Sequence, residues 1–171
     1  MKAGLPFFLA AIGVLLAGCF QSEQPRFPLA SAAAPFGEGG RYVVYEWVAG
    51  DRFDRQEVFV ITRRSDGGYD FGNEKGETLT MSLHALGGNL FVGQASPSKD
   101  QPGYGYVVFR VTDSEALLYA PQCDKQDKAI LDAAGVQMNG QYECVIDRVA
   151  DPAGLFRQLD LGDPASKLIR E

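Results

Sequence analysis

A strict alternation of apolar and polar residues constrains the fold of this chain more than any other feature. From residue 78 the sequence reads TLTMSLHA, in which every second residue is apolar. A period of two is typical of a β-strand that buries one face and keeps the other polar. Two glycines and an asparagine at 87–89 then lead into a second apolar run, LFVGQA. The stretch therefore predicts a β-hairpin with a tight turn.

Two other parts of the chain repeat this plan of strand, short turn and strand. They read VFVITRRSDGGYDF, from residue 58, and VVFRVTDSEALLYA, from residue 107, and a further apolar run, RYVVYEWVAG, begins at residue 41. Consecutive antiparallel strands with one apolar face must close on themselves or pack against another layer. We therefore predict a mainly β domain, an antiparallel meander forming a small barrel or a strongly curved sheet of about seven or eight strands.

The last third of the chain adds a minor helical part. Asp124 is expected to cap a short helix that Gly135 ends, and the pair Asp151-Pro152 is typical of the start of a second helix. The final stretch, DPASKLIRE, repeats the Asp-Pro start. The predicted fold class is therefore β with minor α, with two short C-terminal helices.

The N-terminus carries an apolar stretch from Leu5 to Ala17 after the single positive charge of Lys2. It is shorter than the roughly 20 residues of a membrane-spanning helix, and its small-residue end is typical of a secretory signal peptide. The run ends in Leu16-Ala17-Gly18-Cys19, which resembles the lipobox of bacterial lipoprotein precursors. A plain signal peptide with a chance cysteine and an uncleaved N-terminal helix are the alternatives.

The resemblance to lipoprotein precursors implies a lipid anchor. Residues 1–18 would be a signal peptide, and Cys19 would carry acyl chains such as palmitate on its thiol and on its new amino group. Several acyl chains on one residue suffice for stable membrane anchoring. Apart from this covalent lipid, no cofactor is expected.

The segment 19–40 is rich in proline, alanine, serine and glycine, which predicts a lipidated N-terminus followed by a flexible tether. The remaining residues, 41–171, have the length of a single β-rich domain. The expected location is the cell envelope, lipid-anchored and exposed to the periplasm. The resemblance also favours the outer over the inner membrane, because Phe20 stands where an aspartate would retain a lipoprotein in the inner membrane.

Three cysteines are present, and the anchor would use one of them. Cys123 and Cys144 are then an even pair in an oxidising compartment, for which a disulfide is predicted. A metal pair and a catalytic thiol are the competing interpretations. A zinc site needs four ligands at short spacings, which this pair and the single histidine of the chain do not supply.

The chain is acidic, with a formal net charge of −6 at pH 7. An acidic surface without a basic cluster argues against binding to nucleic acids and against electrostatic docking on anionic lipid headgroups. The one basic pair, Arg63-Arg64, is expected at a solvated strand end. Glu46 interrupts an apolar strand and is expected to face solvent, with an inward position in a polar barrel lumen as the alternative.

Candidate catalytic residues are scarce. His84 is the only histidine, and Ser82, on the same strand face, is held apart from it by the backbone repeat. A solvent-facing polar stripe explains this pair more simply, so we predict no catalytic site, no metal site and no enzyme activity. Tyr104 and Tyr106, on one strand face beside the loop SPSKDQPG, are the candidate recognition surface, with ordinary barrel-wall tyrosines as the alternative.

Three functions follow as hypotheses. The first is a membrane-anchored envelope lipoprotein with a non-catalytic binding or scaffolding role, whose partner is an envelope protein or the cell wall. The second is an inhibitor or small-ligand-binding lipoprotein of barrel type, which in architecture alone resembles the small lipoprotein inhibitors of lysozyme. The third is a hydrolase that uses His84 or a pair of carboxylates. An aromatic cavity at a barrel end would favour the second, and an exposed aromatic patch would favour a protein partner.

Overall fold

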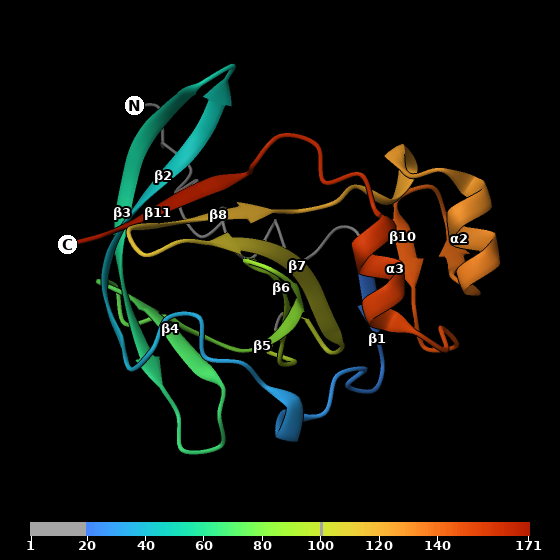
Figure 1. The fold of residues 1–171 in the computed structure, drawn as a ribbon, viewed down its shortest axis with the longest axis horizontal. Helices are drawn as coiled ribbons and strands as arrows, with labels where there is room; N and C mark the ends of the chain where they lie inside the picture. The colour runs from blue at the N-terminus through green and yellow to red at the C-terminus, as the bar shows by residue number, and fades with distance from the viewer. Residues whose placement is uncertain (1–19, 100) are drawn as a thin grey trace, which may run out of the picture.

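The computed structural model describes residues 20–99 and 101–171 and has a closed antiparallel β-barrel at its centre (Figure 1). Each barrel strand pairs with the next one, and the last strand closes the ring by pairing with the first. The eight strands are β2 (Gly39–Ala49), β3 (Arg52–Arg63), β4 (Tyr69–Asn73), β5 (Thr78–Gly87), β6 (Leu90–Ala95), β7 (Tyr104–Val111), β8 (Glu115–Tyr119) and β11 (Ser166–Arg170). The predicted mainly β fold with a small barrel is confirmed.

The strand that closes the barrel comes from the last described residues of the chain. β11 runs antiparallel to both neighbours, with Leu168 opposite Val44 of β2 and opposite Ala116 of β8. The Asp-Pro pair at 163–164 suggests a helix start in the sequence, but a strand follows it instead. Burial alternates along this strand, with Ser166 and Leu168 buried, because one face of it lines the barrel.

The barrel interior is filled by side chains, as expected for a barrel of about eight strands. Large aromatic residues from β2, β3, β4 and β7 dominate it, together with one phenylalanine that precedes β2. The buried residues of this inner core are Phe36, Tyr42, Val44, Phe59, Ile61, Tyr69, Phe71, Met81, Leu83, Ala95, Val107, Phe109, Val111, Ala116, Leu118 and Leu168.

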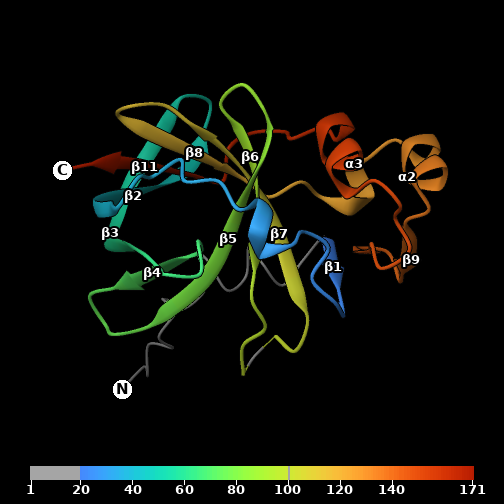
Figure 2. The same ribbon diagram turned by 60° about the horizontal axis from the view of Figure 1, so that its bottom comes forward.

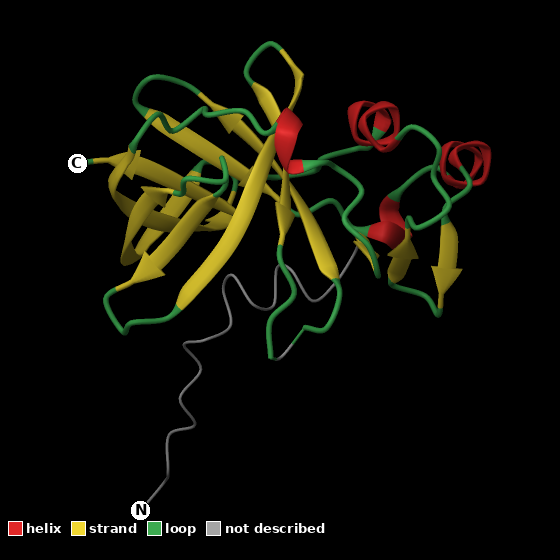
Figure 3. Ribbon diagram, turned by 90° about the horizontal axis from the view of Figure 1, so that it is seen from below, coloured by secondary structure: helices red, strands yellow, loops and turns green. Residues whose placement is uncertain are grey.

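A second core lies outside the barrel, against the outer face of β5, β6 and β7. It is covered by a C-terminal excursion that Figure 3 shows on one side of the barrel. This excursion comprises η2 (Cys123–Lys125), α2 (Lys128–Ala134), β9 (Gln137–Asn139), β10 (Glu143–Val145) and α3 (Pro152–Gln158). In β7, Val107 and Phe109 belong to the inner core whereas Tyr106 and Val108 belong to the outer one. Burial on both faces explains the continuous apolar run of this strand.

The two predicted helices are present, and one cap differs from the prediction. Asp127, not Asp124, caps α2, and its carboxylate accepts a hydrogen bond of 2.8 Å from the Ala129 amide. Gly135 ends α2 with a positive φ of 80°, which glycine adopts without a Cβ clash. Asp151 caps α3, whose first residue is a proline as predicted.

Residues 20–40 are not a free tether, which corrects the sequence-based expectation. The segment begins with β1 (Phe20–Ser22), contains the short turn η1 (Leu29–Ser31), and crosses the outer face of β5 and β7 (Figure 2). Phe20, Phe27 and Phe36 are all buried in it. Composition did not predict this packing, because the segment is rich in proline and has no periodic pattern. Three buried aromatic side chains are nevertheless enough to hold it against the barrel.

The β2–β3 hairpin extends beyond the barrel as a two-stranded arm, clearly visible in Figure 1. β4 pairs with β3 only over residues 59–63. The preceding residues of β3, from Arg52, pair with β2 and not with β4, and this leaves a two-stranded arm. Glu46 lies exposed on this arm, which confirms its solvent-facing position. Trp47 is half-buried there, and its indole Nε1 donates a hydrogen bond of 2.8 Å to the Gly50 carbonyl.

Candidate functional site

A cavity of about 710 Å³ opens at one end of the barrel. Its wall combines parts of the chain that are distant in sequence, namely residues 35–38, the β5–β6 turn at 88–89 and the β7–β8 turn at 111–115. Side chains from β2, β6 and β11 complete the wall. We call this space the mouth cavity.

Phe36 forms the boundary between the mouth cavity and the barrel interior, because it lines the cavity and also belongs to the inner core. Its ring meets those of Tyr69, Phe71 and Phe109 edge-on, at centroid distances of 5.8, 5.9 and 6.0 Å. Edge-to-face packing at such distances is favourable for aromatic rings. The interior behind Phe36 is therefore a packed core, and the room for a ligand lies at the mouth.

Two further aromatic residues, Tyr42 and Phe91, give the mouth cavity an apolar wall. Burial raises the pKa of Tyr42, and the positive charge of Arg170 opposes that shift, so the phenol is neutral at physiological pH. The guanidinium of Arg170 donates a hydrogen bond of 3.2 Å from Nη2 to the Gly39 carbonyl, which holds it at the edge of the cavity.

The charged residues of the mouth cavity are mainly acidic. Glu38, Asp113 and Glu115 supply three carboxylates, against the single guanidinium of Arg170. The β7–β8 turn that carries two of these carboxylates is held by the Thr112 amide, which donates a hydrogen bond of 2.8 Å to the Glu115 carbonyl. The arrangement joins an apolar aromatic wall to a negatively charged rim.

Tyr104 and Tyr106, the predicted recognition surface, do not form an exposed patch. Tyr106 is buried, and its hydroxyl lies 2.6 Å from Ser22 Oγ and 3.2 Å from Gln94 Oε1. Burial raises the pKa of Tyr106 to about 12. Tyr104 is half-buried beside a smaller cavity of about 260 Å³ under the N-terminal segment. The prediction is wrong for Tyr106 because the segment that was expected to be a tether covers it.

Gln94 of β6 fastens the N-terminal segment to the barrel wall. Its Oε1 accepts hydrogen bonds from the amides of Arg26 and Phe27, at 2.7 and 3.0 Å, and its Nε2 donates to the Phe27 carbonyl at 3.0 Å. A buried amide side chain must satisfy both its donor and its acceptor. This polar residue was not singled out from the sequence, because nothing local indicates which backbone groups it meets.

His84 and Ser82 are buried rather than arranged as a solvent-facing stripe, so that simpler interpretation of the sequence is wrong. The two side chains were expected to be held apart by the strand repeat, but His84 Nε2 lies 2.9 Å from Ser82 Oγ, within hydrogen-bond distance, and His84 Nδ1 lies 3.1 Å from Ser31 Oγ in η1. The imidazole also stacks on the Phe27 ring at a centroid distance of 5.1 Å. These described contacts are with hydroxyls and a ring, and together they attach the N-terminal segment to β5.

The pH dependence of stability is expected to carry a contribution from His84. Burial lowers the pKa of His84 in the folded state, whereas the unfolded chain keeps the ordinary value of about 6.5. The unfolded state therefore binds more protons below about pH 6.5, and the free energy of unfolding falls as the pH drops from there towards the lowered pKa.

Urea unfolding of the wild type and of His84→Gln between pH 7.5 and 5 measures this contribution. The wild type should lose more stability than the variant over that interval, and parallel curves would show that His84 titrates normally in the folded state.

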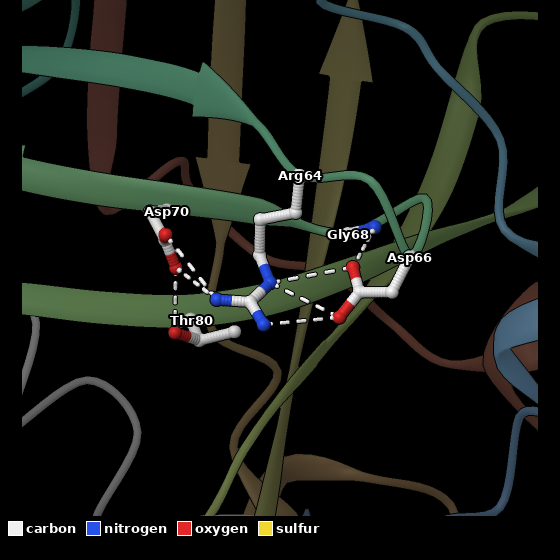
Figure 4. A network of polar contacts seen from close by, with 5 residues as sticks. All are labelled: Arg64, Asp66, Gly68, Asp70 and Thr80. Carbon is white, nitrogen blue, oxygen red and sulfur yellow. Dashed lines mark hydrogen bonds and ion pairs between the residues drawn. The ribbon is translucent and has the colours of Figure 1, made fainter.

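The two residues of the predicted basic pair, Arg63 and Arg64, make different contacts. Arg64 bridges the carboxylates of Asp66 and Asp70 at the β3–β4 turn, with contacts of 3.0 and 3.3 Å (Figure 4). Thr80 Oγ1 donates a hydrogen bond of 2.7 Å to Asp70, and this adds β5 to the network. The Arg64 guanidinium holds the pKa of Asp66 below its usual range. Arg63 lies with its guanidinium 5.9 Å from the centre of the Tyr69 ring. These contacts stabilise the β3–β4 turn and do not indicate a binding site.

The predicted disulfide is confirmed. Cys123 and Cys144 are joined by an S–S bond of 2.02 Å, which links η2 to β10. Cys19, the predicted lipidation site, lies outside the described residues, as does the predicted signal peptide 1–18. Within residues 20–99 and 101–171, no group of three or more histidine, cysteine or acidic side chains is arranged to hold a metal ion. In the same part of the chain, no helix has the length and apolarity needed to cross a membrane.

Comparison with known protein families, with curated proteins and with solved structures finds no match to this chain.

Proposed function

We propose that this protein is a membrane-anchored envelope lipoprotein whose barrel binds a small molecule in the mouth cavity without catalysing a reaction. The supporting observation is the cavity itself. Its volume of about 710 Å³ lies within the range of about 300–1,000 Å³ that is common for small-molecule sites. An apolar wall with a few polar groups is also the usual composition of such sites.

This proposal selects the second of the sequence-based hypotheses. The scaffolding version was built on Tyr104 and Tyr106 as a protein-binding surface, and the burial of Tyr106 removes half of that surface. The form of the hydrolase hypothesis that uses His84 needs a carboxylate next to the imidazole. The described hydrogen-bond partners of His84 are the hydroxyls of Ser82 and Ser31 instead.

The wall and the rim together indicate the class of ligand. Phe36, Tyr42 and Phe91 suit a flat apolar or aromatic body, and their ring faces attract cations. The carboxylates of Asp113 and Glu115 favour a positive charge near the opening. We therefore propose an aromatic or apolar ligand that carries an amine.

A matched pair of fluorescent probes tests this proposal. Dansylcadaverine carries an aromatic group and an amine, and dansylglycine carries the same aromatic group and a carboxylate. Titration should show saturable binding of dansylcadaverine, tighter than that of dansylglycine by about tenfold, which corresponds to about 1.4 kcal/mol.

The Asp113→Asn/Glu115→Gln double variant should lose this preference. The control is Glu46→Gln/Asp51→Asn, which removes the same charge from the arm and should bind like the wild type. Absence of saturable binding, or an unchanged preference in the mouth variant, would contradict the proposal. The lipid anchor is a separate part of it, tested by the intact mass of the protein isolated from the envelope.

A further inference from the structure

The β9–β10 hairpin presents two exposed apolar side chains, Met138 in the middle of β9 and Tyr142 in the turn before β10. Among the described residues, Tyr142 is the most exposed large hydrophobic residue, at 59%, and Met138 is 47% exposed. β9 is the edge strand of the sheet, since β10 is its one neighbour in the described sheet. The hairpin lies at the opposite end of the molecule from β3 (Figures 1 and 2).

The chain enters β1 beside this same hairpin end. β1 and β10 are parallel, with Phe20 opposite Cys144. Both strands therefore start at the same end, and the residues just before β10 are the turn that contains Tyr142. Cys19, the proposed lipidation site, directly precedes Phe20 in the sequence.

Phe20 is held in the folded domain and is not part of a flexible linker. Its side chain is buried, and its ring meets that of Phe156 edge-on at 5.6 Å. Gln21 of the same strand is opposite Gly105 of β7 and Val145 of β10. Acyl chains on Cys19 would therefore leave the protein from a rigid sheet and not from a mobile linker.

From this juxtaposition we propose that the β9–β10 hairpin docks on the lipid bilayer, with Met138 and Tyr142 at the membrane interface. The inference rests on the proposed acylation of Cys19, and it adds a second, non-covalent contact to that anchor. Tyrosine is enriched at membrane interfaces because its ring is apolar and its hydroxyl is hydrated. Methionine supplies a flexible apolar side chain that adapts to an irregular surface.

The disulfide gives the hairpin the rigidity that this docking needs. Cys144 in β10 is bonded to Cys123, and the Met138 sulfur lies 3.2 Å from the Cys123 sulfur. Residues 137–145 of the hairpin contain one charged residue, Glu143, and no lysine or arginine. The docking is therefore expected on zwitterionic lipids and does not require anionic headgroups.

Fluorescence quenching in vesicles tests the docking. The full acylated protein is reconstituted into phosphatidylcholine vesicles with or without brominated acyl chains, which quench tryptophan by contact. Trp47→Phe removes the only tryptophan, and Tyr142→Trp then places a probe on the hairpin. We expect the brominated lipids to reduce its emission by about half or more, since interfacial side chains reach roughly 5–10 Å into the bilayer surface.

The matched control is Val60→Trp in the same background, an exposed position on β3. Figure 1 shows β3 on the opposite side of the molecule from β10. The emission of this control should not change with bromination. Thermal unfolding of both variants checks that they fold like the parent. An acylated protein whose hairpin probe is unquenched, or quenched no more than the β3 probe, would overturn the docking surface alone. An intact mass without acyl groups would overturn the anchor and this surface together, while probe binding at the mouth cavity would be unaffected.

Discussion

Replacing Phe36 by alanine is expected to lower the free energy of unfolding by about 3–5 kcal/mol, as is typical of a buried phenylalanine. The ring is 4% exposed and contacts four aromatic rings of the inner core, those of Tyr42, Tyr69, Phe71 and Phe109. Because Phe36 lies in the segment before β2, the variant also tests whether that segment is part of the domain. Chemical denaturation measures the effect.

Leu29→Ala is the control for Phe36→Ala. Leu29 belongs to the same N-terminal segment but is 49% exposed, so its loss should change stability by no more than about 0.5 kcal/mol. If both variants are as stable as the wild type, the segment is not packed into the barrel, and Phe36 does not close the mouth cavity from the interior.

Removing the disulfide is the second change with a large expected effect. The Cys123→Ala/Cys144→Ala variant should lose about 3 kcal/mol of stability, because the bridge closes a loop with a sequence separation of 21 residues. Chemical denaturation under non-reducing conditions measures the loss. Reduction of the wild type with dithiothreitol should produce a similar loss, and the reductant should not affect the variant.

The effect should be strongest in the C-terminal excursion. The bridge joins η2 to β10, outside the barrel, so amide hydrogen exchange should accelerate first in β9 and β10. Equal stability of the variant and the oxidised wild type would contradict the prediction.

The barrel was predictable because short stretches of sequence identify its strands and turns. Alternating apolar residues and glycine turns identify each hairpin, and sequential hairpins with one apolar face leave few arrangements other than closure. The disulfide was equally predictable, since the count of cysteines and the expected oxidising compartment indicate it without any geometry. The Asp151-Pro152 helix start was predictable from its cap chemistry.

What the sequence did not reveal depends on contacts between distant parts of the chain. The polar face of β5 was identified, but alternation does not indicate whether solvent or protein covers it, and His84 is covered by Phe27. Leu86, two residues after His84 and on the same strand face, belongs to the outer core, whereas Ala85 between them is exposed. The mouth cavity is assembled from turns of separate hairpins, so no single stretch encodes it.

The closing position of β11 has a consequence for how the protein is made. Val44 acquires its second neighbouring strand only when Leu168 reaches it, so the ring cannot be completed until β11 (Ser166–Arg170) has been synthesised. Contacts this distant in sequence slow the formation of native structure. Until β11 has been made, β2 and β8 each keep one unpaired edge, so the growing chain completes its barrel only through late contacts.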